Sequence, residues 1–306
     1  MPDANLPAGL LVFERGWLSS NNILFRGAQS TAMIDSGYAT HAEQTVDLVV
    51  GALQGRTLDV LLNTHLHSDH CGGNSALQAI YPELQTLIPP GQAHFVSTWD
   101  PVALTYAPTG QLCPRFEFTD LLQPGSEIQL ADKAWQIHAA PGHDPHSVIF
   151  FESQSRTLIS ADALWESGFG VVFPELQGGS AFAEVAATLD LIESLDPRTV
   201  IPGHGPVFSY RPEVLASARQ RLDVFVSNPS RHAHHAAKVL LKFKLLEQQQ
   251  LPFVDLLEWA RHTNYFARIR EMFFASISFE DWLDQLTAEL VRSVVAHRNG
   301  ALIFNA

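Results

Sequence analysis

The chain has 306 residues, 46% of them hydrophobic and 17% charged, which suits one large domain or a domain with a smaller companion. Its formal net charge of −13 argues against a general grip on nucleic acid, because phosphate binding needs a positive field. The two cysteines, Cys71 and Cys113, exclude a disulfide framework. No apolar run approaches the roughly 18 residues of a membrane span, and the N-terminus lacks a basic and apolar leader. We expect a cytoplasmic protein that does not act at a membrane.

The charge is unevenly distributed along the chain. Residues 1–210 carry 7 Lys+Arg and 22 Asp+Glu (7 − 22 = −15), whereas residues 211–306 carry 12 and 10 (12 − 10 = +2). Two modules with different surfaces explain this asymmetry. We therefore predict one domain over 1–210 and a second, helical module over 211–306.

In chain order, the sequence of the first domain predicts strands that alternate with helices. Apolar runs bounded by Gly, Ser and Asn predict strands at 10–17, 22–27, 31–37, 58–64, 126–130, 133–140, 146–153, 156–162 and 198–204. Helical periodicity predicts helices at 41–54, 74–81 and 180–195, the first capped by Thr40 and the last by Ser180. Residues 89–125 are rich in proline and poor in periodic runs, which predicts a long functional connection.

The second module has apolar residues three or four positions apart, a spacing typical of helices. It predicts helices at 213–226, 235–250, 253–262 and 279–298, a joint at 227–230 and one short strand at 301–304. The cluster "RHAHH" at 231–235 is interpreted as a solvated helix start, and Cys71 as a small buried filler rather than a reactive thiol.

The segment "NTHLHSDHCGG" at 63–73 follows a buried strand and contains His65, His67, Asp69 and His70. In an extended loop, residues two apart point the same way, so His65 and His67 can bind one metal ion while His70 turns toward a second. Imidazole suits Zn, Fe or Ni, and a carboxylate suits bridging. The segment therefore predicts two adjoining metal sites at a strand end.

Three more predicted strands end on a residue of a metal-ligand type. "AAPGH" ends at His143, "LISAD" at Asp162 and "VIPGH" at His204. Ligands of an open-sheet enzyme are expected beyond the carboxyl ends of its strands, so these runs fit one shared site. Two ions about 3.5–4 Å apart can share a hydroxide that attacks a carbonyl group.

The motifs "THLHSDHCGG", "PGHDPHS", "SADAL" and "PGHGP" together resemble the metallo-β-lactamase superfamily over about residues 10–210, and most of all its hydroxyacylglutathione-hydrolase-like members. The resemblance implies an α/β fold, an αββα sandwich of two mixed sheets. It implies a first metal held by His65, His67 and His143, a second held by Asp69, His70 and His204, and Asp162 as the bridge between them. Asp69 and Asp162 would be catalytic as well, and His146 and Asp35 would orient the site by hydrogen bonds.

The implied function is a dinuclear metal-dependent hydrolase in which a metal-bridging hydroxide attacks an ester, thioester or lactone bond of a small molecule. The cofactors would be two divalent metal ions, Zn first, with Fe, Mn or Ni as alternatives. "PGHGPVF" departs from the Gly-His-Glu of dedicated hydroxyacylglutathione hydrolases, and Asp162 argues against β-lactamase activity. A mononuclear-iron sulfur dioxygenase and an endoribonuclease of the same fold stay open, the latter because the C-terminal module is loosely winged-helix-like.

We expect the module over 211–306 to cover the metal cleft and to help form the substrate pocket, and we leave a homodimer open. Its stretch "NYFARIREMFF" is dense in aromatic residues. Part of that surface could line a pocket or a subunit contact, with Arg268 or Arg270 facing an anionic group of the substrate.

Overall fold

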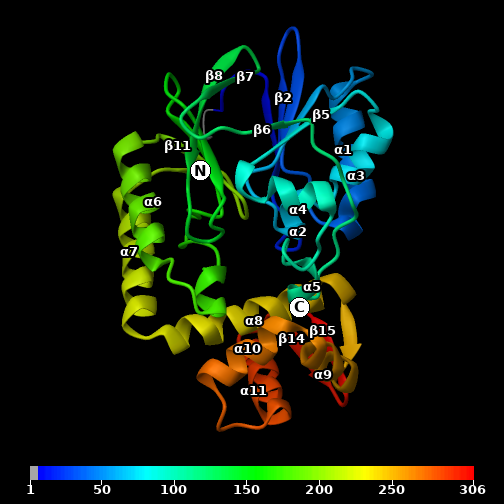
Figure 1. The fold of residues 1–306 in the computed structure, drawn as a ribbon, viewed down its shortest axis with the longest axis vertical. Coiled ribbons are helices and arrows are strands. Elements are labelled where there is room, and N and C mark those ends of the chain that lie inside the picture. The colour runs from blue at the N-terminus through cyan, green and yellow to red at the C-terminus, as the bar shows by residue number, and fades with distance from the viewer. Residues whose placement is uncertain (1–5) are drawn as a thin grey trace.

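The computed structural model describes residues 6–306 and contains the expected αββα sandwich (Figure 1). The first mixed sheet has the order β1-β2-β3-β4-β5-β6. The first three strands are antiparallel, and β3 to β6 run parallel. Its strands are Leu10–Phe13, Asn22–Arg26, Thr31–Ile34, Val60–Leu62, Gln85–Ile88 and Asp120–Leu121.

The second mixed sheet has the order β12-β11-β10-β9-β8-β7, with β10 and β11 parallel and the other pairs antiparallel. Its strands, from β7 to β12, are Glu127–Leu130, Lys133–Ala139, Val148–Glu152, Thr157–Ala161, Thr199–Pro202 and Phe208–Ser209. In β9, Val148 and Phe150 face the first sheet, whereas Ile149 and Phe151 face the outer helices. This alternation follows from the two-residue period of a strand.

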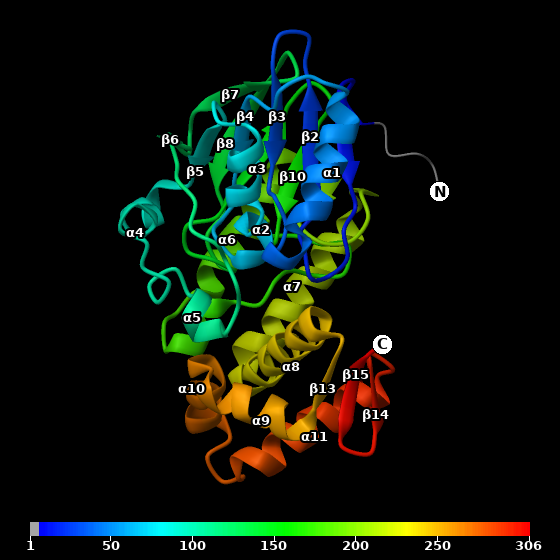
Figure 2. The same cartoon turned by 90° about the vertical axis from the view of Figure 1, so that its right-hand side faces the viewer.

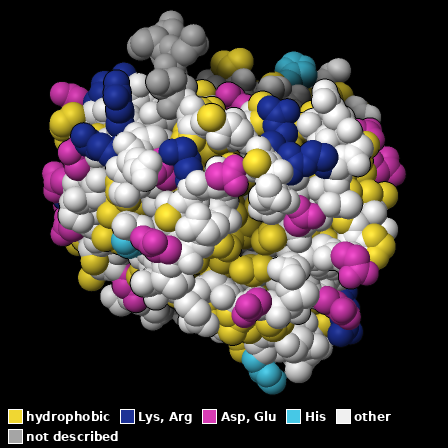
Figure 3. Space-filling model, turned by 90° about the horizontal axis from the view of Figure 1, so that it is seen from above, with side chains coloured by type: hydrophobic (Ala, Val, Ile, Leu, Met, Phe, Trp, Pro, Cys, Tyr) yellow, Lys and Arg dark blue, Asp and Glu magenta, His cyan; other side chains and the backbone are white. Residues whose placement is uncertain are grey.

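Apolar side chains of both sheets form the core between them, including Phe25, Trp135 and Phe150. Helices α1 (Ala42–Leu53) and α3 (Asn74–Ile80) cover the outer face of the first sheet, and α6 (Phe182–Leu195) and α7 (Pro212–Ser227) cover that of the second. Figure 3 shows the end of the sandwich away from the C-terminal part, with hydrophobic side chains at its centre and charged ones scattered around them.

Helix starts differ in detail from the predicted ones. The α-helix α1 begins after the 3₁₀ turn η1 (Ala39–His41), and the side chain of Thr40 does not cap it. Ser180 does not cap α6 either. Instead, the Glu175 carboxylate accepts from the backbone N–H groups of Ala181 and Phe182, because a longer side chain reaches the helix start from the turn η3 (Phe173–Gln177).

The predicted connection over 89–125 is not irregular throughout. It contains the turn η2 (Pro90–Gln92), the helices α4 (Ala93–Thr98) and α5 (Tyr106–Thr109), and the edge strand β6. Sequence patterns did not indicate β5 or β6, because both are short segments near the edge of the sheet with little alternation.

The C-terminal part lies at one end of the sandwich (Figures 1 and 2). Its helices are α8 (Pro229–Gln248), α9 (Phe253–His262), α10 (Asn264–Phe273) and α11 (Phe279–Arg292). It is not all-helical, because β13 (Gln250–Pro252), β14 (Ala296–Asn299) and β15 (Leu302–Asn305) form a three-stranded antiparallel sheet. Along the chain, the C-terminal part has a helix, a strand, three helices and a β-hairpin. Its likeness to a winged helix stays a prediction.

Helix α7 packs both on the sandwich and on the C-terminal helix α8. Leu215, Leu222 and Phe225 lie in the same apolar cluster as Leu189 of α6. The chain then turns at Asn228 into α8, as the joint at 227–230 predicted. The division of the chain at residue 210 stays a prediction. Among the described residues no helix combines the length and the apolar character needed to cross a membrane.

Candidate metal centre

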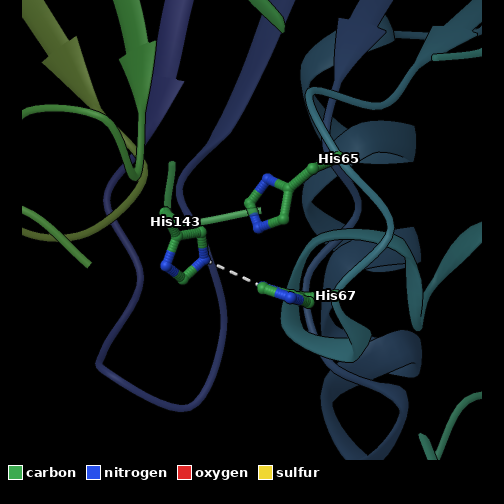
Figure 4. Close-up of side chains that lie close together, drawn as sticks. All are labelled: His65, His67 and His143. Atoms are coloured by element: carbon green, nitrogen blue, oxygen red, sulfur yellow. Dashed lines mark hydrogen bonds between the residues drawn. The ribbon is translucent and has the colours of Figure 1, made fainter. Parts of the chain in front are cut away.

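The structure brings all seven predicted ligands to one end of the sandwich, in three overlapping groups whose ligand atoms lie within 4.8 Å of one another. The groups are His65, His67 and His143; His65, His70 and Asp162; and Asp69, His70 and His204. His65 and His67 follow β4, and the short helix α2 (Ser68–Cys71) presents Asp69 and His70. His143, Asp162 and His204 lie beyond the ends of β8, β10 and β11. Figure 4 shows the His65, His67 and His143 rings converging from two segments of the chain.

Asp162 lies where the groups meet. Its Oδ2 atom is 3.3 Å from His143 Nε2, 3.5 Å from His70 Nε2 and 3.8 Å from His204 Nε2. Its other oxygen, Oδ1, accepts from the Trp165 indole N–H at 3.1 Å. One carboxylate oxygen is thus fixed by the protein, and the other faces ligands of both predicted ions.

Gly203 provides the space that Asp162 occupies. A Cβ atom at Gly203 would lie 2.2 Å from Asp162 Oδ1, which is closer than real contacts allow. The glycine before His204 therefore permits the backbone that follows β11 to approach the carboxylate.

Asp35 contacts the loop that contains the predicted ligands His65 to His70. Its carboxylate accepts from the Thr64 backbone N–H at 2.9 Å and from the Thr64 hydroxyl at 2.8 Å. It also accepts from His70 Nδ1 at 2.8 Å, which turns Nε2 of that ring toward Asp162. In the same way His143 Nδ1 donates to the Val171 carbonyl at 2.6 Å and leaves Nε2 facing the cluster. A hydrogen-bonded second nitrogen is typical of metal-binding histidines.

The donor atoms fit a cation. The Nε2 atoms of His65 and His70 are buried and make no hydrogen bond within the described chain. Burial, and then the neighbouring rings of His70 and His67, lower the pKa of His65 well below its usual value. Burial, followed by His67, lowers the pKa of His143 to about 4. Both rings are neutral near pH 7, so each keeps a lone pair that can bind a metal. At His143 this is Nε2, which accepts from His67 Nδ1 at 2.8 Å (Figure 4).

The carboxylates of the cluster are ionised. Burial raises the pKa of Asp162, but His204 and His70 outweigh it and hold that pKa well below the usual value. For Asp69, too, His70 and His204 outweigh burial and lower the pKa. Burial lowers the pKa of His70, yet Asp35 and Asp162 raise it well above the usual value. Buried carboxylates surrounded by imidazoles create a field that favours a cation.

His146 does not make the expected hydrogen bond. Within the described chain its imidazole has no hydrogen-bond partner, and it packs so closely on Gly91 that a Cβ there would lie 2.1 Å from Nδ1. Asp144 orients the loop instead. Its Oδ1 accepts from the His146 backbone N–H at 2.7 Å, and its Oδ2 is 3.7 Å from His67 Nε2. The adjacency of Asp144 to His143 was the only signal in the sequence.

Cys71 is buried, as predicted for a small apolar filler. Its sulfur is 3.8 Å from Cys113 Sγ and 3.2 Å from the Tyr106 hydroxyl. Burial and Cys113 raise the pKa of the Cys71 thiol well above its usual value. The side chain therefore faces away from the ligand groups, toward the loop over 106–113.

A cavity of about 420 Å³ opens over the cluster. Helix α8 and the end of α11 line its far side with Leu240, Phe243, Leu246 and Leu290, while Trp17, Trp165 and Phe173 surround the metal-ligand side. Within the described residues, the C-terminal part thus contributes one wall of the cavity over the candidate metal centre.

Two expectations about the C-terminal part are wrong. Arg268 and Arg270 do not face the cavity; their guanidinium groups donate to the carbonyls of Gln177 and Ile277, which lie near helix ends. The cluster at 231–235 is not simply a solvated helix start. His232 is 1% exposed and His235 is half-buried, because α8 packs on α7 along this turn. The aromatic residues of α9 to α11 mainly form the core of the C-terminal part itself.

The sequence is similar to those of several known proteins. The family model of the metallo-beta-lactamase superfamily matches residues 15–204. A hydroxyacylglutathione hydrolase of Francisella tularensis is 31% identical over 39% of this chain, but the match spans only 38% of that enzyme's length. An acyl-coenzyme A thioesterase of Gallus gallus is 25% identical over 67% of this chain and 81% of its own.

The fold is also similar to that of solved structures. A metallo-beta-lactamase family protein from Thermus thermophilus superposes with a TM-score of 0.56. It is 18% identical, and the superposition covers 99% of this chain and 100% of that protein. At this identity the likeness establishes the fold alone, and that fold extends into the C-terminal part.

Proposed function

This chain belongs to the metallo-beta-lactamase superfamily, and from that premise we propose that it is a dinuclear metal-dependent hydrolase that cleaves an ester, thioester or lactone bond of a small molecule. The observation that carries the proposal is the position of Asp162 Oδ2, which faces His143 on one side and His70 and His204 on the other. A single-metal site has no need of a carboxylate between two complete ligand groups.

The ligands divide naturally between two ions. His65, His67 and His143 would hold the first ion, Asp69, His70 and His204 the second, and Asp162 both. When bound, two divalent ions would supply a water activated at neutral pH and would polarise the bond to be cleaved. Zn²⁺ is our first choice, because imidazole and carboxylate donors suit it, although Fe, Mn or Ni can bind the same donors.

A carboxylate of the chain would then take up the proton that the water molecule releases. Asp69 and Asp162 both line the cavity, and their lowered pKa values keep them ionised near pH 7. Asp69 can accept a proton from a water molecule held in the cavity, whereas both oxygens of Asp162 are engaged, Oδ1 with Trp165 and Oδ2 between the predicted ligand groups. Trp165 prevents Asp162 from rotating, because its indole N–H holds Oδ1.

The cavity supports a small substrate with an apolar part. Its volume of about 420 Å³ lies within the usual range for small-molecule sites, and Leu240, Phe243 and Leu246 give it an apolar wall. One relative is named as a thioesterase, so acyl thioesters are the first substrates to test.

The test is hydrolysis by protein that has been stripped with a chelator and then reloaded. We expect the stripped protein to be inactive on acyl thioesters, acyl esters and lactones, and reloading with Zn²⁺ or Fe²⁺ to restore cleavage of at least one class. Oxygen consumption with a persulfide, or cleavage of RNA without any thioester, ester or lactone cleavage, would contradict the proposal and favour the dioxygenase or the endoribonuclease.

A further inference from the structure

Arg221 of α7 is an arginine whose charge is not compensated. Its guanidinium is largely enclosed and forms no ion pair with a carboxylate of the described chain. Nη2 lies 2.8 Å from His235 Nε2, Nη1 lies 3.5 Å from the Ser167 carbonyl, and the buried Nε has no hydrogen-bond partner. Burial alone lowers the pKa of this arginine, with no acidic group raising it.

Arg219, on the same helix, has the ion pairs with carboxylates that Arg221 lacks. Arg219 reaches solvent and bonds to Asp190 at 2.6 Å and to Glu193 at 2.7 Å. A guanidinium stays charged in proteins, and enclosing a charge without a partner is costly. At Arg221 the Phe169 and Phe225 rings, each 5.4 Å from the guanidinium carbon, replace only part of the lost hydration. The enclosed charge therefore suits a ligand that supplies the missing anion.

The surroundings of Arg221 are shaped to hold it in place. Burial, and then Arg221, lower the pKa of His235 to about 3, so this ring is neutral and accepts from the guanidinium. Gly168 has φ +122°, and a Cβ atom there would lie 2.9 Å from Arg221 Nη1. A glycine at this position keeps open the space that the guanidinium occupies.

Arg221 also stands in the right place for a substrate group. It lines the cavity over the metal ligands together with Asp69 and Asp162, and it lines a neighbouring cavity of about 500 Å³. That second cavity adds Arg231 and His234 to its wall.

Lys238 and Lys242 of α8 line the metal-facing cavity too, but Lys238 pairs with Glu289, and Lys242 donates to the Val295 carbonyl and to Asn305. Arg221 is therefore the least compensated cation on this lining, beside the apolar side chains of α8.

We propose that Arg221 binds an anionic group on the leaving-group side of the substrate, so that the preferred substrates are acyl thioesters or esters of a thiol or alcohol bearing a carboxylate or phosphate. The acyl chain would lie along Leu240, Phe243 and Leu246. These side chains follow His235, which Arg221 contacts, further along the same helix, so the charge would lie at the Arg221 end of the cavity, beyond the scissile bond. This inference rests on the proposed hydrolase function and names the substrate class of that same site.

The test compares octanoyl thioesters of three thiols: 3-mercaptopropionate, 2-mercaptoethyl phosphate and the neutral 3-mercaptopropionamide. We expect the wild-type protein to have a KM for at least one anionic thioester about 10- to 100-fold below that for the neutral one, as a charge-assisted hydrogen bond supplies. Whether the carboxylate or the phosphate gives the larger effect identifies the anion. Arg221→Gln should abolish the preference, so that the KM values for the three thioesters become equal within about threefold.

Arg219→Gln is the matched control, since it removes a guanidinium from the same helix and should keep the full preference. Arg221→Lys keeps the charge and should retain part of the preference for the anionic thioesters. It replaces Arg221→Gln as the test variant if Arg221→Gln does not fold. Equal KM values for all three thioesters in the wild-type protein, or an intact preference in Arg221→Gln, would overturn the inference.

Calorimetry separates this inference from the hydrolase proposal. The thioether 3-(octylthio)propionate cannot be hydrolysed, and we expect it to bind the wild-type protein at least about tenfold more tightly than its amide does. If no thioester is cleaved, the hydrolase proposal fails, while loss of this difference in Arg221→Gln still tests the role of Arg221. Equal affinities for the acid and the amide would reject the anion site itself.

Discussion

The backbone N–H of Val172 donates to Nε2 of His232 at 3.1 Å, which ties helix α8 to the segment beside the metal ligands. The preceding residue, Val171, accepts from His143 Nδ1 through its carbonyl. One peptide unit therefore links the C-terminal part to a candidate ligand. This contact gives α8 a structural role at the metal centre in addition to lining the cavity.

Replacing His232 with leucine should destabilise the protein. The Val172 N–H would be left buried without an acceptor, which costs about 1–3 kcal/mol in the free energy of unfolding. His232→Gln retains an acceptor and should cost less. Urea denaturation measures both. His94→Leu, at an exposed position of α4, should change the free energy of unfolding by no more than about 0.5 kcal/mol; a loss no larger in His232→Leu would show that the contact is unimportant.

Acid should weaken the same contact. Burial, and then Arg221, lower the pKa of His232 to about 4, below the usual 6.5. Below pH 6.5 the imidazole of His232 is protonated in the unfolded chain but not in the folded one. Its contribution to the free energy of unfolding is therefore complete above pH 6.5 and is lost as the pH falls toward 4. The lost free energy is on the order of 3 kcal/mol. Urea denaturation at pH 7.5 and pH 4.5 should give a smaller difference for His232→Gln than for the wild-type protein. An equal difference in both would assign the acid sensitivity to other groups.

Asp162→Asn tests the bridging position. The amide retains the shape of the side chain but removes the charge that faces His143, His70 and His204. We expect metal content to fall to one ion per chain or fewer and kcat to drop at least about 100-fold, with unchanged circular dichroism. Asp190→Asn, on the surface of α6, is the control. Full activity and two ions in Asp162→Asn would refute the bridge.

Gly203→Ala tests the same carboxylate from the backbone side. The added methyl group would lie 2.2 Å from Asp162 Oδ1, so Asp162 or the backbone after β11 must shift. We expect weaker metal binding, measured by competition with a chromogenic chelator, of about 10- to 100-fold. Gly51→Ala adds the same methyl group where nothing lies within 4 Å, inside α1, and should leave metal affinity unchanged. Wild-type affinity in Gly203→Ala would mean that the close approach is not needed.

Much of the fold was predictable because its signals are local. The strands before His65, His143, Asp162 and His204 are short apolar runs, and each ends shortly before a ligand. Their meeting at one end of the sandwich follows from the general rule that sites lie beyond the carboxyl ends of strands. Asp35 was identified by its place at the end of β3 and by the family resemblance.

Other features depend on contacts between distant segments and left no local pattern. Asp144 replaces His146 in orienting the loop, and Glu175 replaces Ser180 at the start of α6. Arg221 differs from Arg219 only in what surrounds it after folding. The position of α7, which packs on α6 of the sandwich and on α8 of the C-terminal part, likewise depends on contacts that charge counting does not show.

The most direct test of the central claim is the number of metal ions that active protein holds. Metal-free protein is titrated with Zn²⁺ or Fe²⁺ while bound metal is determined by elemental analysis and thioester hydrolysis is followed in the same samples. The account predicts two ions per chain and activity that saturates only as the second ion binds. A single tightly held iron, with the second ligand group empty at saturation, would contradict it.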